Sequence, residues 1–521
     1  MSREKKNTFL LHGGILALAG IIVRVIGMLY RIPLINIIGS EGNGIYSVAF
    51  NIYNIMLVLS SYGLPMAVSK LTSARFAKKQ YKNAGQIFRF SVIVSVCTGG
   101  TAALVLFFGS GAIEKFYKTV TGLSIPLKVL APTIFFVAIL GVVRGFFQGQ
   151  GTMIPTAVSQ LIEQIINAAV SIIAGFMLMK AFASSANASA YGAAGGTLGT
   201  AAGALVALLF LVGIYIIYRP VFLKMMAKDH VSEKLPSGEI YKTIILTMVP
   251  IIIGQTLYNI SAVIDDAMYS NMASSVCSAS KIKADLGNFA SCFTLLISIP
   301  QGVASAMSSS MLPSVVASFT EGKIRDVRTK ISNTVKTNMF IAIPSFVGLT
   351  VLGEPIIKLI FSSADSAQGA VMLKIGACAV VFYTLSTVTS SALQGINKMN
   401  VPVIHSFISL VIHIIAVFAM LKWSRLGIYA IVIGNASFPV LILILNLISL
   451  RKYTGYKMEY LQTFGIPLVC SAFMGIVTIL SYRLMYMLTS SNAVSVIVAL
   501  VFALVSYFAP VVLLKKMKNR R

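Results

Sequence analysis

The chain is a succession of apolar segments, each about long enough to cross a bilayer and joined to the next by a short polar connection. A hydrocarbon core of roughly 30 Å requires about 20 apolar residues in a helix, so 521 residues can hold about fourteen spans. Charged residues make up 11% of the chain, whereas about a quarter of a soluble domain is charged. The sequence therefore predicts an all-α membrane protein of about fourteen transmembrane helices. The segments lie near 9–31, 45–69, 90–113, 126–147, 154–179, 192–217, 243–264, 287–312, 337–361, 367–392, 401–421, 427–449, 462–484 and 491–514.

The distribution of basic residues predicts the orientation of the chain. The net charge is +27, and the Lys and Arg residues cluster between apolar segments and not on one continuous face. Such clusters mark cytoplasmic connections and attract anionic lipid, so they do not indicate a nucleic-acid partner. Under a fourteen-helix count the clusters all fall on one side, which predicts a multi-pass plasma-membrane protein with both termini in the cytoplasm. The clusters lie at 70–89, 218–242, 319–336, 451–457 and 515–521.

The first apolar segment has some features of a signal peptide. Basic residues precede an apolar run and the small-residue stretch 17–19, where a signal peptidase could cut. The apolar character nevertheless continues past Arg24 to Leu29. This continuation favours a first transmembrane helix over a cleaved leader.

Motifs for soluble chemistry are absent from the sequence. It contains no phosphate-binding P-loop, no HExxH zinc motif and no GxSxG nucleophile elbow. The five cysteines are scattered without a CxxC pair, so neither a disulfide framework nor a metal site is indicated. The glycine-rich stretch 192–203 is typical of close helix packing. We therefore expect a protein that is not an enzyme and that uses no cofactor apart from a coupling ion of unknown identity.

An internal repeat divides the chain. Gln148-Gly149, between spans four and five, matches Gln394-Gly395 between spans ten and eleven, and residues 76–83 match 319–326 at a similar offset. Six spans per repeat is an even number, so both halves have the same orientation. We expect two parallel six-helix lobes, 1–217 and 243–449, plus an extra helix pair at 462–514. Such a duplication is typical of transporters that work by alternating access.

Two arginines in the first span are candidate substrate ligands. Arg24 lies sixteen residues beyond Thr8, about 24 Å along a helix, which predicts a position in the outer half of the membrane. Arg31 follows seven residues later on nearly the same face. Two guanidinium groups suit a phosphate, because the planar fork donates paired hydrogen bonds. Alternatively, Arg24 pairs with an internal carboxylate and Arg31 reaches the outer headgroups.

Carboxylates within or near the spans are candidate coupling groups, since an ionisable residue in a membrane is expensive. Glu163 lies near the middle of span five and either carries a coupling proton or neutralises Arg24. Asp265 and Asp266 follow span seven, where an ion site is one option and solvated loop carboxylates are the favoured one. Arg144 lies near the end of span four, and we expect its side chain to reach toward the membrane surface.

Several motifs resemble the multidrug/oligosaccharidyl-lipid/polysaccharide exporter superfamily along essentially the whole chain. The nearest branch resembles the stage V sporulation protein B group of polysaccharide-biosynthesis transporters, which is related to the MurJ-type lipid II flippases. The motifs are Arg24-Val25-Ile26-Gly27 with Arg31, and the stretches 38–39, 49–50, 249–254, 299–303 and 352–361.

This resemblance implies a flippase that moves an undecaprenyl-pyrophosphate-linked sugar, such as the peptidoglycan precursor lipid II, from the inner to the outer leaflet. It implies that Arg24 and Arg31 hold the pyrophosphate and that the pair at 462–514 forms a groove for the polyprenyl tail. It also implies cell-wall synthesis proteins as partners and a role in sporulation. Gram-negative lipid II flippases carry further arginines in spans two and eight, but 55–58 and 294–296 contain no basic residue here.

Three alternatives stay open at this point. The chain could transport another polyprenyl-linked polysaccharide unit, or it could be a drug/cation antiporter of the same superfamily. Such antiporters usually have twelve spans and favour a carboxylate-rich cavity, whereas this first lobe combines arginines with one glutamate. A membrane glycosyltransferase is the third alternative, although the short external connections leave little room for a catalytic carboxylate.

Overall fold

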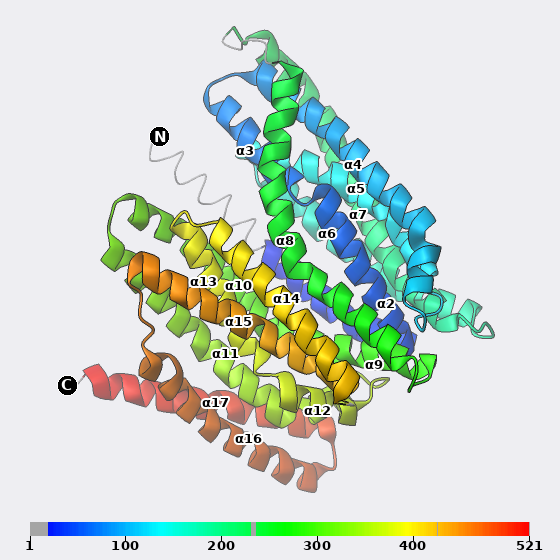
Figure 1. The fold of residues 1–521 in the computed structure, drawn as a ribbon, viewed down its shortest axis with the longest axis vertical. Helices are drawn as coiled ribbons and strands as arrows, with labels where there is room; N and C mark the ends of the chain where they lie inside the picture. Colours follow the sequence, from blue (N-terminus) through cyan, green and yellow to red (C-terminus); the bar gives the residue numbers. More distant parts are fainter. Residues whose placement is uncertain (1–18, 231–235, 425, 520–521) are drawn as a thin grey trace. The chain divides into compact units, whose positions relative to one another are not determined.

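The computed structural model describes residues 19–230, 236–424 and 426–519, and every regular element in these ranges is helical (Figure 1). The described residues belong to two compact units, 1–284 and 285–521. In the first unit, helical residues 19–29 precede α2 (Arg31–Ser61), α3 (Leu64–Ala77), α4 (Tyr81–Phe116), α5 (Ser124–Gly149), α6 (Ile154–Ala181), α7 (Ala188–Ala227), α8 (Ser237–Ala273) and α9 (Ala279–Asn288), which ends just inside the second unit. The second unit continues with the π-helix η1 (Phe289–Leu295), α10 (Leu296–Thr320), α11 (Ile324–Ile360), α12 (Ser366–Gly376), α13 (Ala379–Gly395), α14 (Asn400–Trp423), α15 (Ile428–Thr454), η2 (Leu461–Gly465), α16 (Ile466–Thr489) and α17 (Asn492–Asn519).

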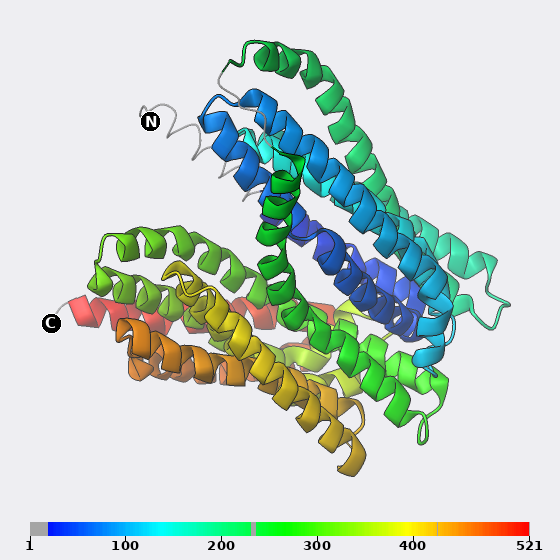
Figure 2. The ribbon, with the colours of Figure 1, turned by 45° about the horizontal axis from the view of Figure 1, so that its top comes forward.

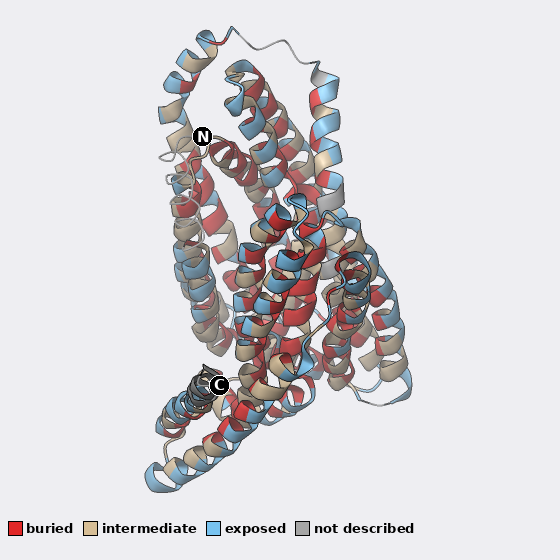
Figure 3. Ribbon diagram, turned by 90° about the vertical axis from the view of Figure 1, so that its left-hand side faces the viewer, coloured by how far each residue is buried: buried red, intermediate tan, exposed pale blue. Residues whose placement is uncertain are grey.

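The helices of each unit bury one side and leave an apolar outer surface. Buried residues lie along the inward faces of the helices, and exposed ones run along their outer faces (Figure 3). Many exposed side chains are large and apolar, for example Ile217 at 79% and Val469 at 71% exposure. Such a surface suits lipid and not water. The chain is therefore an integral membrane protein, as its composition predicts.

Within the described residues, twelve helices are long and apolar enough to cross a membrane, or thirteen if the bent pair α12–α13 is one span. Residues 19–77 enter that number once, as a single run. The run nevertheless changes direction at Gly39, whose φ of 71° and ψ of 175° are not helical. It therefore supplies both of the first two predicted spans, which makes thirteen candidate spans in the described residues, or the expected fourteen if the bent pair α12–α13 is one span. Residues 9–18 of the predicted first span lie outside the described residues.

Contacts across Gly39 show that the chain reverses there. In one straight helix, Arg31 and Tyr46 would lie about 22 Å apart along the axis. The guanidinium carbon of Arg31 is instead 5.9 Å from the centre of the Tyr46 ring. Glycine permits this turn because a positive φ costs it little. The first helix thus ends at Ile38, seven residues later than we predicted.

Two pairs of turns with positive φ recur at the offsets of the predicted internal repeat. Lys79 and Gly322, which are 243 positions apart, both have positive φ, at 57° and 72°. Gly151 and Asn397, which are 246 positions apart, also both have positive φ, at 84° and 61°. In each pair the turn ends one helix and begins the next at the matching place. The same turn geometry at two nearly equal offsets is what a duplicated chain would retain.

Close packing in the glycine-rich stretch agrees with its predicted role. A Cβ added at Gly195 would lie 2.5 Å from the carbonyl oxygen of Ala174 on α6, and one at Gly199 would overlap the hydroxyl of Ser171. Only glycine allows α6 and α7 to approach so closely.

Three polar contacts join predicted connections that the fourteen-helix count places on the same side of the membrane. In the first unit, Asp229 of the sixth connection accepts the backbone N–H of Lys82 in the second at 2.8 Å. Glu41 of the first connection pairs with Lys283 after span seven at 3.1 Å. In the second unit, Lys336 of the eighth connection pairs with Glu459 of the twelfth at 2.8 Å. Odd connections therefore meet odd ones and even connections meet even ones.

The C-terminal helices α16 and α17 form an antiparallel hairpin that lies along α11 (Figures 1 and 2). The hydroxyl of Tyr507 on α17 donates to the carbonyl of Phe340 on α11 at 2.9 Å. Near the other end, the side chain of Asn492 donates to the carbonyl of Pro355 at 3.0 Å. The pair is thus attached to the second unit along the length of α11.

Helix α8 contacts α2, α3 and α4 and lies within the first unit. From the sequence we assigned residues 243–264 to the second lobe. The lobe boundaries at 217 and 243 stay a prediction. Several basic residues that we expected in connections lie within helices, because α3 continues to Ala77 and α7 to Ala227.

Candidate functional site

Arg24 lies in the first helix, which continues past the predicted end of the first span. The first helix ends at Ile38, so Arg24 lies about 22 Å from the turn at Gly39. The first helix is thus longer than the sequence predicts, and the position of Arg24 in the outer half of the membrane stays a prediction. The side chain of Arg24 is exposed. One turn later, Gly27 faces α6, where an added Cβ would lie 3.1 Å from Nε2 of Gln164.

Arg31 begins α2 after a one-residue interruption of the helix at Tyr30. Pro33 explains this interruption, since proline has no N–H to donate to the carbonyl of residue 29. Tyr30 keeps helical angles, φ −70° and ψ −23°, so the chain continues in nearly the same direction. The hydroxyl of Tyr30 accepts a hydrogen bond from Nδ2 of Asn167 on α6 at 3.4 Å. The segment that carries both arginines therefore packs against α6.

The guanidinium of Arg31 lies over two aromatic rings of the second half of α2. Its Cζ atom is 5.9 Å from the centre of the Tyr46 ring and 5.5 Å from that of Phe50. The two rings stack on each other, with centroids 5.6 Å apart and an interplanar angle of 15°. Among the ion pairs of the described residues, none involves Arg31. Cation–π contacts therefore hold this charge in place without neutralising it.

The aromatic row on the second half of α2 continues toward a carboxylate. Phe50 is followed by Tyr53, whose ring centre lies 5.5 Å away. Tyr53 is buried and within electrostatic range of Glu163 on α6. Residues 46, 50 and 53 lie on one face of a helix because of their spacing. The structure thus connects Arg31 with Glu163 through a row of aromatic side chains.

Glu163 forms an ion pair with Arg144 of α5. Its Oε2 lies 2.7 Å from Nη2 of Arg144, and the two side chains are 27% and 14% exposed. Nε of Arg144 also donates to the hydroxyl of Ser159 at 3.0 Å. Arg144 therefore does not reach for the membrane surface as we expected, because a carboxylate and a hydroxyl satisfy it inside the protein. Glu163 therefore neutralises Arg144, whereas the sequence suggested Arg24 as its partner.

Asp265 and Asp266 lie within α8, and each is 4% exposed. The prediction of solvated loop carboxylates is wrong, since α8 continues nine residues beyond the predicted end of span seven. Oδ2 of Asp266 accepts a hydrogen bond from Nδ2 of Asn51 on α2 at 2.8 Å. In the connection before α5, burial and the nearby Asp266 raise the pKa of Tyr117. Asp266 and Arg31 therefore both contact the second half of α2. Asp266 does so through Asn51, the residue after Phe50.

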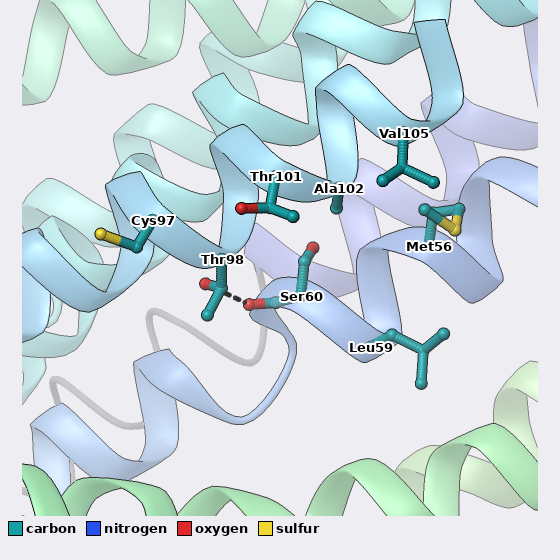
Figure 4. Close-up of a pocket in the computed structure, with 8 residues that line it drawn as sticks. All are labelled: Met56, Leu59, Ser60, Cys97, Thr98, Thr101, Ala102 and Val105. Atoms are coloured by element: carbon teal, nitrogen blue, oxygen red, sulfur yellow. Dashed lines mark hydrogen bonds between the residues drawn. The ribbon is translucent and has the colours of Figure 1, made fainter. Parts of the chain in front are cut away.

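A shallow groove of about 430 Å³ lies between α2 and α4 (Figure 4). Its lining is largely apolar, with Met56 on one side and Cys97 on the other. The hydroxyl of Thr98 donates to the carbonyl of Ser60 at 2.8 Å, which ties the two helices together beneath the groove. None of the predicted site residues lines it. Within the described residues there is also no group of three or more His, Cys, Asp or Glu side chains arranged to bind a metal ion.

The sequence did not single out Tyr46, Phe50 or Arg144 as site residues. The spacing of the two rings puts them on one helix face, but that face is visible as part of a site only once the chain turns back at Gly39. Arg144 is recognisable as a partner only from the packing of α5 on α6. In the structure, Arg31, Glu163 and Asp266 all lie near the second half of α2.

Comparison with known proteins gives a consistent result. A family model described as polysaccharide biosynthesis protein matches residues 10–319, and the MatE model matches residues 250–419. The lipid II flippase MurJ of Bacillus subtilis (strain 168) is 27% identical over 480 residues, which cover 89% of this chain and 86% of that protein. Stage V sporulation protein B of the same organism is 23% identical over 474 residues, which cover 89% and 88%.

Solved structures share the fold. The lipid II flippase MurJ in an inward closed conformation matches with a TM-score of 0.67 at 14% identity, over 94% of this chain and 97% of that one. A multidrug resistance MATE family transporter in an inward-facing conformation also has a TM-score of 0.67, at 18% identity over 82% and 96%.

Proposed function

The chain belongs to the polysaccharide biosynthesis protein family, within the multidrug/oligosaccharidyl-lipid/polysaccharide exporter superfamily, and on that basis we propose that it flips a lipid-linked anionic saccharide across the plasma membrane. The proposed substrate is an undecaprenyl-pyrophosphate-linked sugar, with lipid II as the first to test. The relatives at 27% and 23% identity, named as a lipid II flippase and a stage V sporulation protein, support this substrate class.

The observation that carries the proposal is the environment of Arg31. A charged residue inside a membrane costs roughly 2.5–3.5 kcal/mol or more at the centre. Arg31 bears that cost with aromatic rings beside it and, among the described residues, without an ion-pair partner. An anionic head group would supply the missing charge. We propose that Arg31, together with Arg24 about two turns away on nearly the same helix face, holds the pyrophosphate.

Coupling to an ion gradient is assigned to the carboxylates near α2. Glu163, Asp265 and Asp266 are the candidates, and each is close to α2 or to a residue that contacts it. Protonation of one of them would change the charge balance around the arginines. In this proposal the two halves of the duplicated fold alternately open the site to each side of the membrane.

The remaining parts of the proposal follow the family. Both termini are in the cytoplasm, the hairpin α16–α17 accommodates the polyprenyl tail, and cell-wall synthesis proteins supply or receive the substrate. A drug/cation antiporter is the second candidate function. It is favoured by the two buried carboxylates of α8, which would suit a cationic substrate.

The test is complementation in cells depleted of their own lipid II flippases, with lipid II exposure at the outer leaflet as the readout. Wild type should restore exposure, and Arg31→Ala should abolish it at equal membrane levels. Arg24→Ala should weaken it as well. Lys180→Ala is the matched control, because Lys180 is an exposed basic residue at the end of α6.

The outcomes separate the candidates. If wild type inserts correctly but does not expose lipid II, the substrate is wrong, and other polyprenyl-linked glycans and drug cations are tested next. If wild type restores exposure and Arg31→Ala does so equally, flipping is supported but the first-helix phosphate site is rejected.

A further inference from the structure

We infer that Tyr46 and Phe50 form an aromatic platform that orients Arg31 toward a pyrophosphate, and that the Tyr46 hydroxyl is a further ligand of that group. The inference rests on the proposed function, since it concerns the same site. It adds two residues of α2 to the arginines and assigns each a separate task.

The platform holds the guanidinium of Arg31 through cation–π contacts. The stacked rings of Tyr46 and Phe50 lie 5.9 and 5.5 Å from the guanidinium carbon. An arginine held through its face keeps its in-plane N–H groups available, and these are the groups that form paired hydrogen bonds with phosphate. The rings therefore help to fix the direction of Arg31, and the side chains of Tyr30 and Tyr46 also lie close to its guanidinium.

The hydroxyl of Tyr46 is a buried polar group beside Arg31 and Tyr30. Tyr46 is 3% exposed, and its hydroxyl oxygen has no hydrogen-bond partner among the described residues. Arg31 and Tyr30 are both within electrostatic range of it. A buried hydroxyl without a partner costs free energy, and native structures usually satisfy such groups. An anion bound at Arg31 would accept a hydrogen bond from this hydroxyl.

The surrounding helices keep the Tyr46 ring where it is. A Cβ added at Gly196 of α7 would lie 3.2 Å from two carbons of that ring, so glycine makes the space for it. The carbonyl of Gly196 accepts a hydrogen bond from Ser171 of α6 at 2.7 Å. The ring is therefore clamped between α2 and α7. Removal of the hydroxyl alone should leave this packing intact.

The experiment measures binding of farnesyl pyrophosphate to the purified full-length protein by calorimetry. Tyr46→Phe removes only the hydroxyl and should weaken binding about tenfold, the effect of one hydrogen bond to a charged group. Phe50→Leu removes one aromatic face and should weaken binding about threefold, as expected for a cation–π contact of modest strength. Tyr53→Phe is the matched control, because its hydroxyl lies on the same helix face but beside Glu163.

A structural role would give a different pattern. If Tyr46 only packs, Tyr46→Phe binds farnesyl pyrophosphate as wild type does, and the inference is overturned. It is overturned equally if Tyr53→Phe weakens binding as much as Tyr46→Phe. Thermal unfolding midpoints of the variants equal to that of wild type support a direct contact with the ligand when binding falls.

The binding result is independent of the flipping result. If wild type binds farnesyl pyrophosphate with the expected order of variants but exposes no lipid II in cells, the platform is supported and the proposed transport of lipid II fails. If wild type exposes lipid II but Tyr46→Phe leaves binding of farnesyl pyrophosphate unchanged, the proposed function holds and the platform fails.

Discussion

The ion pair between Glu163 and Arg144 allows a quantitative test of why a carboxylate is present in the middle of α6. Both side chains are largely buried, with Nη2 and Oε2 2.7 Å apart. Removing one partner of a fully buried pair costs about 3–5 kcal/mol, whereas an exposed pair contributes about 0–1 kcal/mol. At 14% and 27% exposure we expect Glu163→Gln to cost about 2–3 kcal/mol of unfolding free energy.

The two single substitutions should not be equivalent. Glu163→Gln leaves an arginine that cannot lose its charge, so the whole penalty remains. Arg144→Met leaves a carboxylate that can take up a proton and become neutral, so it should cost less. The double variant Glu163→Leu with Arg144→Met removes both charges and should be nearly as stable as wild type. Thermal unfolding in detergent measures all three, with a drop of a few degrees expected for Glu163→Gln.

Transport by the double variant separates the two roles of Glu163. If the carboxylate only neutralises Arg144, the double variant flips substrate as wild type does. If Glu163 carries a coupling proton, the double variant is stable but inactive. Single variants that are no less stable than the double variant would refute the reasoning from the ion pair.

Three further outcomes follow from the packing. Gly199→Val should destabilise the protein by about 1–3 kcal/mol, because its side chain would overlap Ser171, whereas Gly213→Val, with open space around it, should be nearly neutral in the same thermal assay. Asp266→Asn should fold normally, since an amide still accepts from Asn51, but its transport should no longer respond to an imposed proton gradient if this carboxylate couples. The variant Glu41→Cys should react with an impermeant thiol reagent added outside intact cells. Labelling only from the cytoplasmic side would show that the predicted topology is inverted.

The sequence by itself determined the helical class and the number of spans. A helix satisfies its backbone hydrogen bonds within its own segment, so a run of about twenty apolar residues specifies a transmembrane helix without reference to neighbours. The repeat was visible for a similar reason, since the Gln-Gly motifs mark turns whose geometry recurs at Gly151 and Asn397. The grouping of the odd and even connections also followed from counting alone.

Only the tertiary structure decided where the first helix ends and which partners the charged groups have. The first helix ends at Gly39 and not near Arg31, which brings Arg31 against the second half of α2. Glu163 pairs with Arg144 and Asp266 with Asn51 because α5, α6, α8 and α2 pack in a particular rotation about their axes. Periodicity gives the face on which a residue lies but not which helix that face meets, since interhelical packing depends on the small residues and shapes of several segments together.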